Sequence, residues 1–253
     1  MPSLPTCLHP HWKAPASVHS LVTTREHGPS QAPFAHFNLG DHVGDNSTEV
    51  EQCRLLLQQK VGLPLLWLDQ VHGNQVITDW PQGVKVPPQA DACVSTSFEY
   101  ACVVLTADCL PIFLCTQAGD QVGVIHAGWR GLAAGVIEAS VAAFHTPAEY
   151  LLAWLGPAIG PKAFEVGPEV RETFTQIDPR LADAFTPSPY RLNYFMADIY
   201  QLARQRLQAM GVHHIYGGGF CTFTDTQRFY SYRREGRTGR MASVIWLAEP
   251  ESA

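Results

Sequence analysis

The chain has 253 residues, 46% of them apolar, which is enough to fill the core of one large domain or two small ones. Its 17 basic and 23 acidic side chains give a formal charge of −6, which argues against a surface that follows a nucleic-acid backbone. No apolar run approaches the length of about 20 residues that spans a membrane, the N-terminus lacks a signal-peptide pattern, and the cysteines fit reduced thiols. We therefore expect a cytoplasmic protein with no nucleic-acid or membrane partner, either a monomer or a small homo-oligomer.

The first half of the chain predicts one helix followed by short strands. Residues 1–16 are rich in proline and histidine, and we expect them to be irregular. A helix is expected over 46–60, because Asn46 can cap its start and Gly62 is typical of a helix end. The spacing of the later apolar runs favours hairpins or neighbouring strands over regular strand–helix–strand units. These runs are Leu65–Leu68, Gln75–Thr78, Ala101–Leu105, Ile112–Cys115 and Val122–Ile125.

The second half predicts more helices, again mixed with strands. Helices are expected over 132–144, over 168–174 with Pro168 in the first turn, and over 194–210, where Gly211 ends the apolar stripe. Strands and helices without strict alternation predict an α+β fold, with a mixed β-sheet core flanked by helices in a single domain over 1–253. The remaining strands are expected at Leu151–Leu155, His214–Tyr216, Phe229–Tyr232 and Val244–Leu247.

Three side chains suited to metal binding stand in separate loop motifs. They are His72 in Gln-Val-His-Gly, Cys109 in Thr-Ala-Asp-Cys-Leu-Pro and His126 in His-Ala-Gly-Trp-Arg-Gly. Taken singly, these residues also fit a histidine in a surface turn or a buried, inert cysteine. Taken together, two imidazoles and a thiolate suit zinc, and three protein ligands leave a fourth position open for water or substrate. Because structural zinc sites usually recruit closely paired ligands, the dispersed trio predicts a catalytic zinc site.

Basic residues near glycine-rich turns are candidates for binding an anionic substrate. The strand that ends at His126, the glycine loop after it and the next helix together favour anions, and Arg130 adds a planar guanidinium. A turn that only packs Trp129 in the core explains the same residues. Arg25 precedes a Gly-Pro turn and is a further candidate. The run 229–234, with Arg237 and Arg240 after it, can stack a ring and bind anions, although an exposed edge strand has the same composition.

Several long motifs, found in the family's order, resemble the YfiH family, also called the laccase-domain or peptidoglycan-editing-factor family, and in particular its enterobacterial-type members. The resemblance runs from about Thr24 to Leu247. After Thr-Arg the family pattern usually has two glycines, whereas Glu26-His27-Gly28 follows here, and this bulkier turn would shift Arg25. The motifs are Asn38-Leu39-Gly40, Trp67-Leu-Asp-Gln-Val-His-Gly73, Thr106-Ala-Asp-Cys-Leu-Pro111, His126-Ala-Gly-Trp-Arg-Gly131, Leu155-Gly-Pro-Ala-Ile-Gly-Pro161, Phe164-Glu-Val-Gly167 and Ser231-Tyr-Arg-Arg234.

The resemblance implies a compact α+β fold related to deamidating cytotoxic-necrotizing-factor toxins, and a purine nucleoside phosphorylase that acts on adenosine, inosine and methylthioadenosine. Adenosine deaminase activity is implied as well. The resemblance also implies a zinc site whose ligands are the catalytic residues, and a second group that binds substrate or phosphate. The first group is His72, Cys109 and His126, and the second is Arg25, Asn38 and Arg130.

Other functions remain open at this point. Family members are linked to removing muropeptide precursors that carry serine in place of alanine, which here would use zinc or a Cys109 nucleophile, with His126 or His72 as base and Asp108 nearby. A copper polyphenol-oxidase activity is also attached to the family, but multicopper chemistry uses many histidines, typically in His-x-His pairs, and only His9-Pro10-His11 has that form. A zinc-stabilised binding module without catalysis would need a fourth protein ligand, which the sequence does not name.

Overall fold

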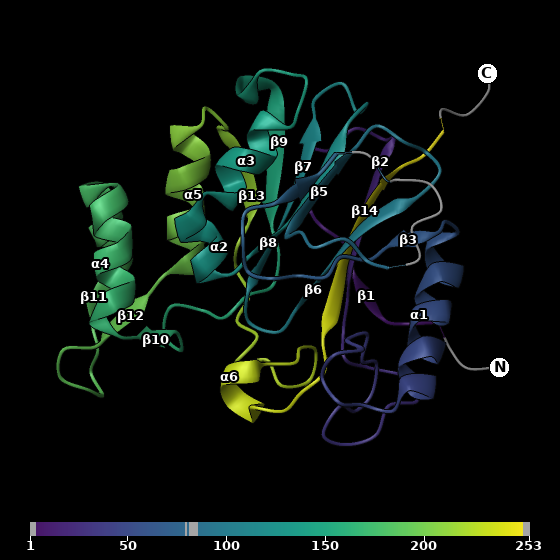
Figure 1. The fold of residues 1–253 in the computed structure, drawn as a ribbon, viewed down its shortest axis with the longest axis horizontal. Coiled ribbons are helices and arrows are strands. Elements are labelled where there is room, and N and C mark those ends of the chain that lie inside the picture. Colours follow the sequence, from purple (N-terminus) through teal and green to yellow (C-terminus); the bar gives the residue numbers. More distant parts are fainter. Residues whose placement is uncertain (1–3, 79, 81–85, 250–253) are drawn as a thin grey trace.

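Two β-sheets packed face to face form the centre of the fold, and helices cover both outer faces (Figure 1). The computed structural model describes residues 4–78, 80 and 86–249. Helix α1 covers one sheet, whereas α2, α3 and α5 cover the other, and α4 lies beyond them beside a small third sheet. The helices are α1 (Ser47–Val61), α2 (Trp129–Ala134), α3 (Val136–Ala142), α4 (Pro168–Ile177), α5 (Ile199–Ala209) and α6 (Tyr232–Glu235), with 3-10 turns at Ala148–Tyr150 and Pro179–Ala184.

Both large sheets are mixed, as the sequence predicts. Among the described strands, β3 and β6 pair in parallel in the five-stranded sheet, and β13 with β9 and β4 with β5 do so in the six-stranded sheet. The five-stranded sheet has the order β1 (Cys7–Leu8), β2 (Val18–Thr23), β14 (Met241–Leu247), β6 (Ala101–Thr106) and β3 (Leu65–Leu66). The six-stranded sheet has the order β13 (His214–Gly217), β9 (Leu151–Leu155), β7 (Leu110–Thr116), β8 (Val122–Ala127), β5 (Ala92–Ser95) and β4 (Val76–Ile77). The small sheet joins β10 (Glu165–Val166), β12 (Phe195–Ala197) and β11 (Phe185–Pro187).

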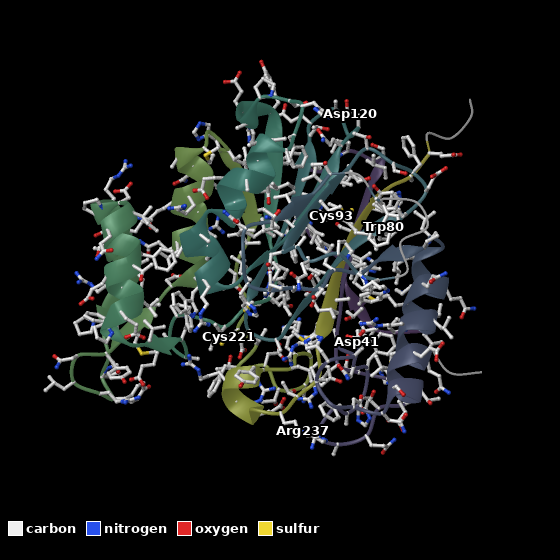
Figure 2. The ribbon with its side chains drawn as sticks, viewed as in Figure 1. Asp41, Trp80, Cys93, Asp120, Cys221 and Arg237 are labelled. Carbon is white, nitrogen blue, oxygen red and sulfur yellow. The ribbon has the colours of Figure 1, made fainter. Side chains whose placement is uncertain are left out.

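Apolar side chains fill three layers between these elements. Between the two large sheets, Val104 and Ile245 meet Phe113 and Val124, and Cys93 lies in the same layer (Figure 2). A second layer joins the five-stranded sheet to α1, and a third joins the six-stranded sheet to α2, α3, α4 and α5. The central strands are thus covered on both faces, which is why β7 reads as an unbroken apolar run without alternation. No helix in the described part of the chain is both long and apolar enough to cross a membrane.

Several predicted elements are confirmed where local signals act alone. The Asn46 side chain accepts a hydrogen bond from Thr48 N at 2.9 Å, and Gly62 ends α1 with a left-handed φ of 82°. A helix begins at Pro168 as predicted and continues to Ile177. Strand β9 has the predicted bounds. The two helices obey capping and turn rules that need no distant partner, whereas β9 also pairs with β7 and β13.

Other predictions were wrong because a single backbone feature interrupts a periodic pattern. The helix predicted over 132–144 is two helices, because Gly135 adopts a φ of 89° between them. The helix predicted from Tyr194 instead starts after Asp198, whose carboxylate caps it, and residues 195–197 form β12. The strand predicted over 229–232 is a buried loop leading into α6. The segment predicted as irregular lies outside the described part at residues 1–3. Its described residues 4–16 are irregular except for Cys7–Leu8, which pairs with β2.

The connection between β6 and β7 places candidate site residues at the edge of both sheets. Strand β6 belongs to the five-stranded sheet and β7 to the six-stranded sheet, so residues 107–109 carry the chain from one layer to the other. Asp108 makes this turn with a φ of 93°. Strand β8 runs antiparallel to β7, with Leu110 opposite Ala127 and Pro111 opposite His126. Cys109 and His126 therefore lie at the same edge.

Candidate metal centre

His72, Cys109 and His126 come together at this edge, and their ligand atoms all lie within 4.8 Å of one another. Cys109 Sγ is 3.9 Å from His72 Nε2, and the two imidazole centroids are 4.7 Å apart with the rings nearly perpendicular. Within the described residues this is the one group of three or more His, Cys, Asp and Glu side chains that can hold a metal ion. Two nitrogens and a thiolate sulfur are a donor set that zinc accepts, so the residues fit the metal that the sequence predicts.

Each member of the trio is placed by a different element. His126 lies in β8 and is buried, with 3% of its surface exposed. Cys109 follows the left-handed turn at Asp108 and immediately precedes β7. His72 sits in the loop between β3 and β4, itself with a positive φ of 60°. A left-handed φ is costly for a histidine, so the surrounding contacts must hold that loop.

Asp91, which the sequence analysis did not identify, holds that loop and His126 together. It directly precedes β5, whose antiparallel register with β8 puts it beside His126. Its Oδ1 accepts hydrogen bonds from His126 Nδ1 at 2.7 Å and from His72 N at 2.9 Å. Its Oδ2 accepts from Gly73 N at 2.7 Å and Val71 N at 3.3 Å, and the residue is fully buried. One carboxylate thus orients one imidazole and fixes the backbone that carries the other.

The charges of the trio favour an ionised thiol. Burial raises the pKa of Cys109, but the charge of His126 and hydrogen bonds from His126 and His72 outweigh it and lower that pKa to about 6. Burial lowers the pKa of His126, but the Cys109 charge and the Asp91 hydrogen bond raise it to about 9. A thiolate is the form of cysteine that binds metals and acts as a nucleophile. The pocket therefore stabilises the reactive form of Cys109.

The trio opens into a cavity of about 420 Å³. Its walls are partly apolar, and Tyr232 and Phe164 offer aromatic faces while Arg233 and Arg240 offer guanidinium groups. The side chains that line the cavity are His42, Gln70, His72, Leu105, Thr106, Ala107, Asp108, Cys109, His126, Ile159, Phe164, Tyr232, Arg233 and Arg240. A cavity of this size, with a few polar groups among apolar walls, is typical of a small-molecule site.

The cysteine-hydrolase interpretation placed Asp108 near Cys109, and the structure shows that its carboxylate bonds other groups than the two histidines. Its Oδ1 accepts a hydrogen bond from Thr222 Oγ1 at 2.6 Å, and its Oδ2 accepts one from Arg233 N at 2.7 Å. The carboxylate therefore ties the turn before Cys109 to the start of α6. The acidic partner of His126 is Asp91 instead.

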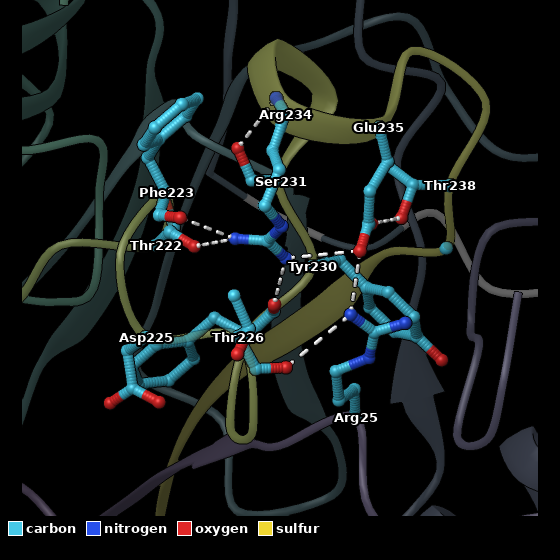
Figure 3. A network of polar contacts seen from close by, with 12 residues as sticks. Arg25, Thr222, Phe223, Asp225, Thr226, Tyr230, Ser231, Arg234, Glu235 and Thr238 are labelled. Atoms are coloured by element: carbon cyan, nitrogen blue, oxygen red, sulfur yellow. Dashed lines mark hydrogen bonds and ion pairs between the residues drawn. The ribbon is translucent and has the colours of Figure 1, made fainter. Parts of the chain in front are cut away.

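The three residues predicted to bind substrate or phosphate are not brought to the cavity. The Arg25 guanidinium pairs with Glu235 at 2.8 Å, lies 4.6 Å over the Tyr230 ring and takes part in the network of Figure 3. Asn38 is fully buried, and its Oδ1 accepts from Arg240 N at 2.9 Å. Arg130 is exposed and stacks on Trp129 at 4.5 Å. Asn38 thus supports a cavity residue, while Arg25 and Arg130 lie outside the lining.

A Gly128→Ala substitution is expected to disturb the trio without changing the fold. A Cβ at Gly128 would lie 3.0 Å from Cys109 Sγ and 3.1 Å from His72 Cδ2, although its φ of −68° suits alanine. The ligands must shift by a few tenths of an ångström, so zinc affinity should fall about 10-fold. Competition with a fluorescent zinc chelator measures this. Gly219→Ala is the control, since its Cβ would meet nothing within 4 Å. Unchanged zinc affinity in Gly128→Ala would contradict the proposed ligand positions.

Comparison with known proteins identifies the family. A family model described as multi-copper polyphenol oxidoreductase laccase matches residues 19–248. A purine nucleoside phosphorylase of Pseudomonas aeruginosa is 53% identical over 96% of this chain and 98% of its own length. The purine nucleoside phosphorylase YfiH of Escherichia coli is 49% identical over 94% of this chain and 97% of its own.

Solved structures agree with the fold. A crystal structure of a Neisseria meningitidis protein of the DUF152 family has a TM-score of 0.92 and 46% identity, covering 96% of this chain and 99% of that one. The structure of YlmD from Geobacillus stearothermophilus has a TM-score of 0.84 and 28% identity, covering 98% of this chain and all of that one. The family match and the identities to its relatives show that the chain belongs to the YfiH, or laccase-domain, family.

Proposed function

We propose that the chain is a zinc-dependent purine nucleoside phosphorylase acting on adenosine, inosine and methylthioadenosine. The observation that carries this proposal is the open cavity in which His72, Cys109 and His126 meet aromatic and guanidinium side chains. Relatives that share about half of its residues over nearly their whole length are named purine nucleoside phosphorylases. The partners this function requires are small molecules, a purine nucleoside and phosphate.

The cavity residues can bind and position such substrates. Tyr232 and Phe164 supply faces on which a purine ring can stack, and Ile159 and Leu105 supply apolar contact. His72, Cys109 and His126 would hold zinc, which would supply a Lewis acid next to the bound nucleoside. Asp91 keeps His126 Nδ1 occupied and so leaves Nε2 for the cavity side. We propose that the catalytic role of these three ligands is to hold that charge where the reacting bond changes.

Adenosine deamination is proposed as a second activity of the same cavity. Both reactions accept the same purine nucleoside, and a zinc site with an open position can also activate water. Chromatography of adenosine incubated with the protein distinguishes them, because deamination yields inosine and ammonia whereas phosphorolysis yields adenine. We expect both products, with adenine formed only when phosphate is present.

One observation favours a second candidate function, hydrolysis of a muropeptide precursor by a Cys109 nucleophile. The ionised thiol, His126 and Asp91 have the order of a nucleophile, a base and a group that orients the base. A thiolate bound to zinc is a poor free nucleophile, however. Metal analysis of protein purified without added metal separates the two, because stoichiometric zinc rules out the simple cysteine mechanism.

We propose zinc rather than copper for the site, although the family description names copper oxidases. Three ligands in one cluster provide for one ion, and two imidazoles with a thiolate are suited to zinc. Elemental analysis of protein produced in medium containing both metals tests this. A copper content above the zinc content would overturn the assignment.

The direct test of the proposed reaction is release of hypoxanthine from inosine, measured by chromatography with and without inorganic phosphate. Protein of known zinc content should release hypoxanthine only with phosphate, and ribose 1-phosphate should accumulate in equal amount. Release at the same rate without phosphate would instead indicate a hydrolase. No release by zinc-loaded protein from any of the three nucleosides would refute the proposal.

A further inference from the structure

Two arginines line the cavity, Arg233 and Arg240, and neither forms an ion pair within the part of the chain that the structure describes. Most of the other arginines form ion pairs with acidic side chains, often at the surface. Those that contact a carboxylate are Arg25, Arg54, Arg180, Arg191, Arg206, Arg228 and Arg234. In a chain with a net charge of −6, two guanidinium groups in one cavity that form no ion pair with a described residue need an explanation.

Arg240 is held firmly but keeps part of its guanidinium free. Its backbone N donates to Asn38 Oδ1 at 2.9 Å, and its side-chain stem lies against Gly40, where a Cβ would come within 2.8 Å of Arg240 Cγ. Nη1 donates to the carbonyls of Thr238 and Gly239, both at 3.0 Å. These bonds use one end of the guanidinium and leave Nε and Nη2 without a partner among the described residues. The group is therefore positioned in advance for a ligand.

Arg233 is placed beside the same cavity by the start of α6. Its backbone N donates to Asp108 Oδ2 at 2.7 Å, which anchors it to the turn before Cys109. Its Nη1 donates to Glu165 O at 2.8 Å, and the guanidinium carbon lies 5.6 Å from the Phe164 ring centre. The side chain is exposed. Arg233 thus adds a second positive charge, held less tightly than that of Arg240.

The negative groups of the cavity offset these charges only in part. Asp108 is the one carboxylate in the cavity lining, and its charge acts on Arg240. Its two oxygens accept hydrogen bonds from Thr222 Oγ1 and Arg233 N, and among the described residues it forms no ion pair with either guanidinium. Cys109 would be committed to zinc in the loaded site. The cavity therefore attracts anions, and a fork of N–H groups is suited to phosphate oxygens.

We propose that Arg240, assisted by Arg233, binds inorganic phosphate as the nucleophilic co-substrate. This inference rests on the proposed phosphorylase function. In that reaction an oxygen of hydrogen phosphate bonds to the ribose C1′, and the C1′–N9 bond breaks with its electron pair going to the purine. The proton of hydrogen phosphate balances the charge on the departing base, giving ribose 1-phosphate and free base. Arg233 and Arg240 belong to the C-terminal region that the sequence analysis named as a candidate for binding anions. In this proposal they bind the phosphate in place of Arg25, Asn38 and Arg130.

The experiment measures binding of inorganic phosphate to zinc-loaded protein by isothermal titration calorimetry. Arg240→Gln should weaken phosphate binding about 10- to 100-fold, because it removes charge-assisted hydrogen bonds. Arg240→Lys should recover part of that loss, since it restores the charge without the fork. Arg233→Gln should have a smaller effect. The control is Arg237→Gln, an exposed arginine outside the cavity lining whose Nη2 donates to Gly44 O (Figure 2).

A specific readout separates phosphate binding from a purely structural role. In steady-state assays Arg240→Gln should raise the KM for phosphate and leave the KM for inosine and the zinc content unchanged. If the wild-type protein binds no phosphate, or folded Arg240→Gln with full zinc binds it as tightly as wild type, the inference is overturned. If phosphate binds and depends on Arg240 but no ribose 1-phosphate forms, the phosphate site stands and the phosphorylase proposal falls.

Discussion

A Cys109→Ala variant is expected to fold normally, to bind little zinc and to lose phosphorolysis by about 100- to 1000-fold. Cys109 Sγ supplies the thiolate of the trio, and the ligand atoms of the other two members lie within 4.8 Å of it. Two histidines alone hold zinc much less tightly than two histidines and a thiolate. The fold should survive, because Cys109 lies at a partly exposed turn outside the three apolar layers. Elemental analysis and the hypoxanthine assay measure the two losses.

Cys221→Ala is the matched control for this variant. Cys221 is also partly exposed, and hydrogen bonds lower its pKa although burial acts in the opposite direction. It lines a different cavity, beside Tyr200 and Arg228. Its loss should leave zinc content and activity unchanged. If Cys109→Ala keeps full zinc yet loses activity, the thiol acts as the nucleophile. If it keeps both, the trio is not the active centre.

Asp91→Asn is expected to weaken zinc binding about 10- to 100-fold. The carboxylate accepts four hydrogen bonds, including those from His126 Nδ1 and from the backbone of His72. An asparagine keeps the shape but turns an amide N–H₂ toward groups that are themselves donors. The His126 ring then loses its orientation, and the loop that carries His72 loses the contacts that support its positive φ. Zinc affinity is measured by chelator competition, and folding by circular dichroism.

Asp120→Asn is a suitable control for the acidic substitution. Asp120 lies in the turn between β7 and β8, where it accepts a hydrogen bond from Thr116 Oγ1 at 2.5 Å. This turn is at the opposite end of the hairpin from Pro111 and His126. The control should therefore bind zinc like the wild type. Equal zinc affinity in Asp91→Asn and wild type would show that Asp91 does not position the ligands.

Much of the fold could be predicted because its signals are local. Helix α1 follows from Asn46 and Gly62, and β9 from an apolar run between turns. The periodic pattern was misleading where one residue decides the structure. Gly135 divides a continuous apolar stripe into two helices, and the Asp198 cap makes α5 start at Ile199, five residues after the predicted start. The aromatic run at Phe229 and Tyr230 suggested a strand. Both side chains are buried, but they lie in a loop, so the burial does not reflect a strand period.

The three residues of the trio could be predicted from the sequence, whereas the residues that surround and orient them could not. His72, Cys109 and His126 could be found because metal-binding side chains within glycine and proline turns are conspicuous in a sequence. Asp91 could not, because its role depends on the register between β5 and β8. The acidic residue directly before a small apolar strand, Ala92–Ser95, was the only local signal. The position of Arg25 outside the cavity could not be predicted either, because its ion pair with Glu235 joins residues at opposite ends of the chain.

The central claim is that purine phosphorolysis takes place at zinc held by the trio. The most direct measurement removes zinc from the protein with a chelator and then titrates zinc back, following ribose 1-phosphate formed from inosine and phosphate at each addition. Activity should rise in proportion to zinc and level off at one equivalent per chain. Full activity in the metal-free protein, or zinc-loaded protein that forms no ribose 1-phosphate, would contradict the claim.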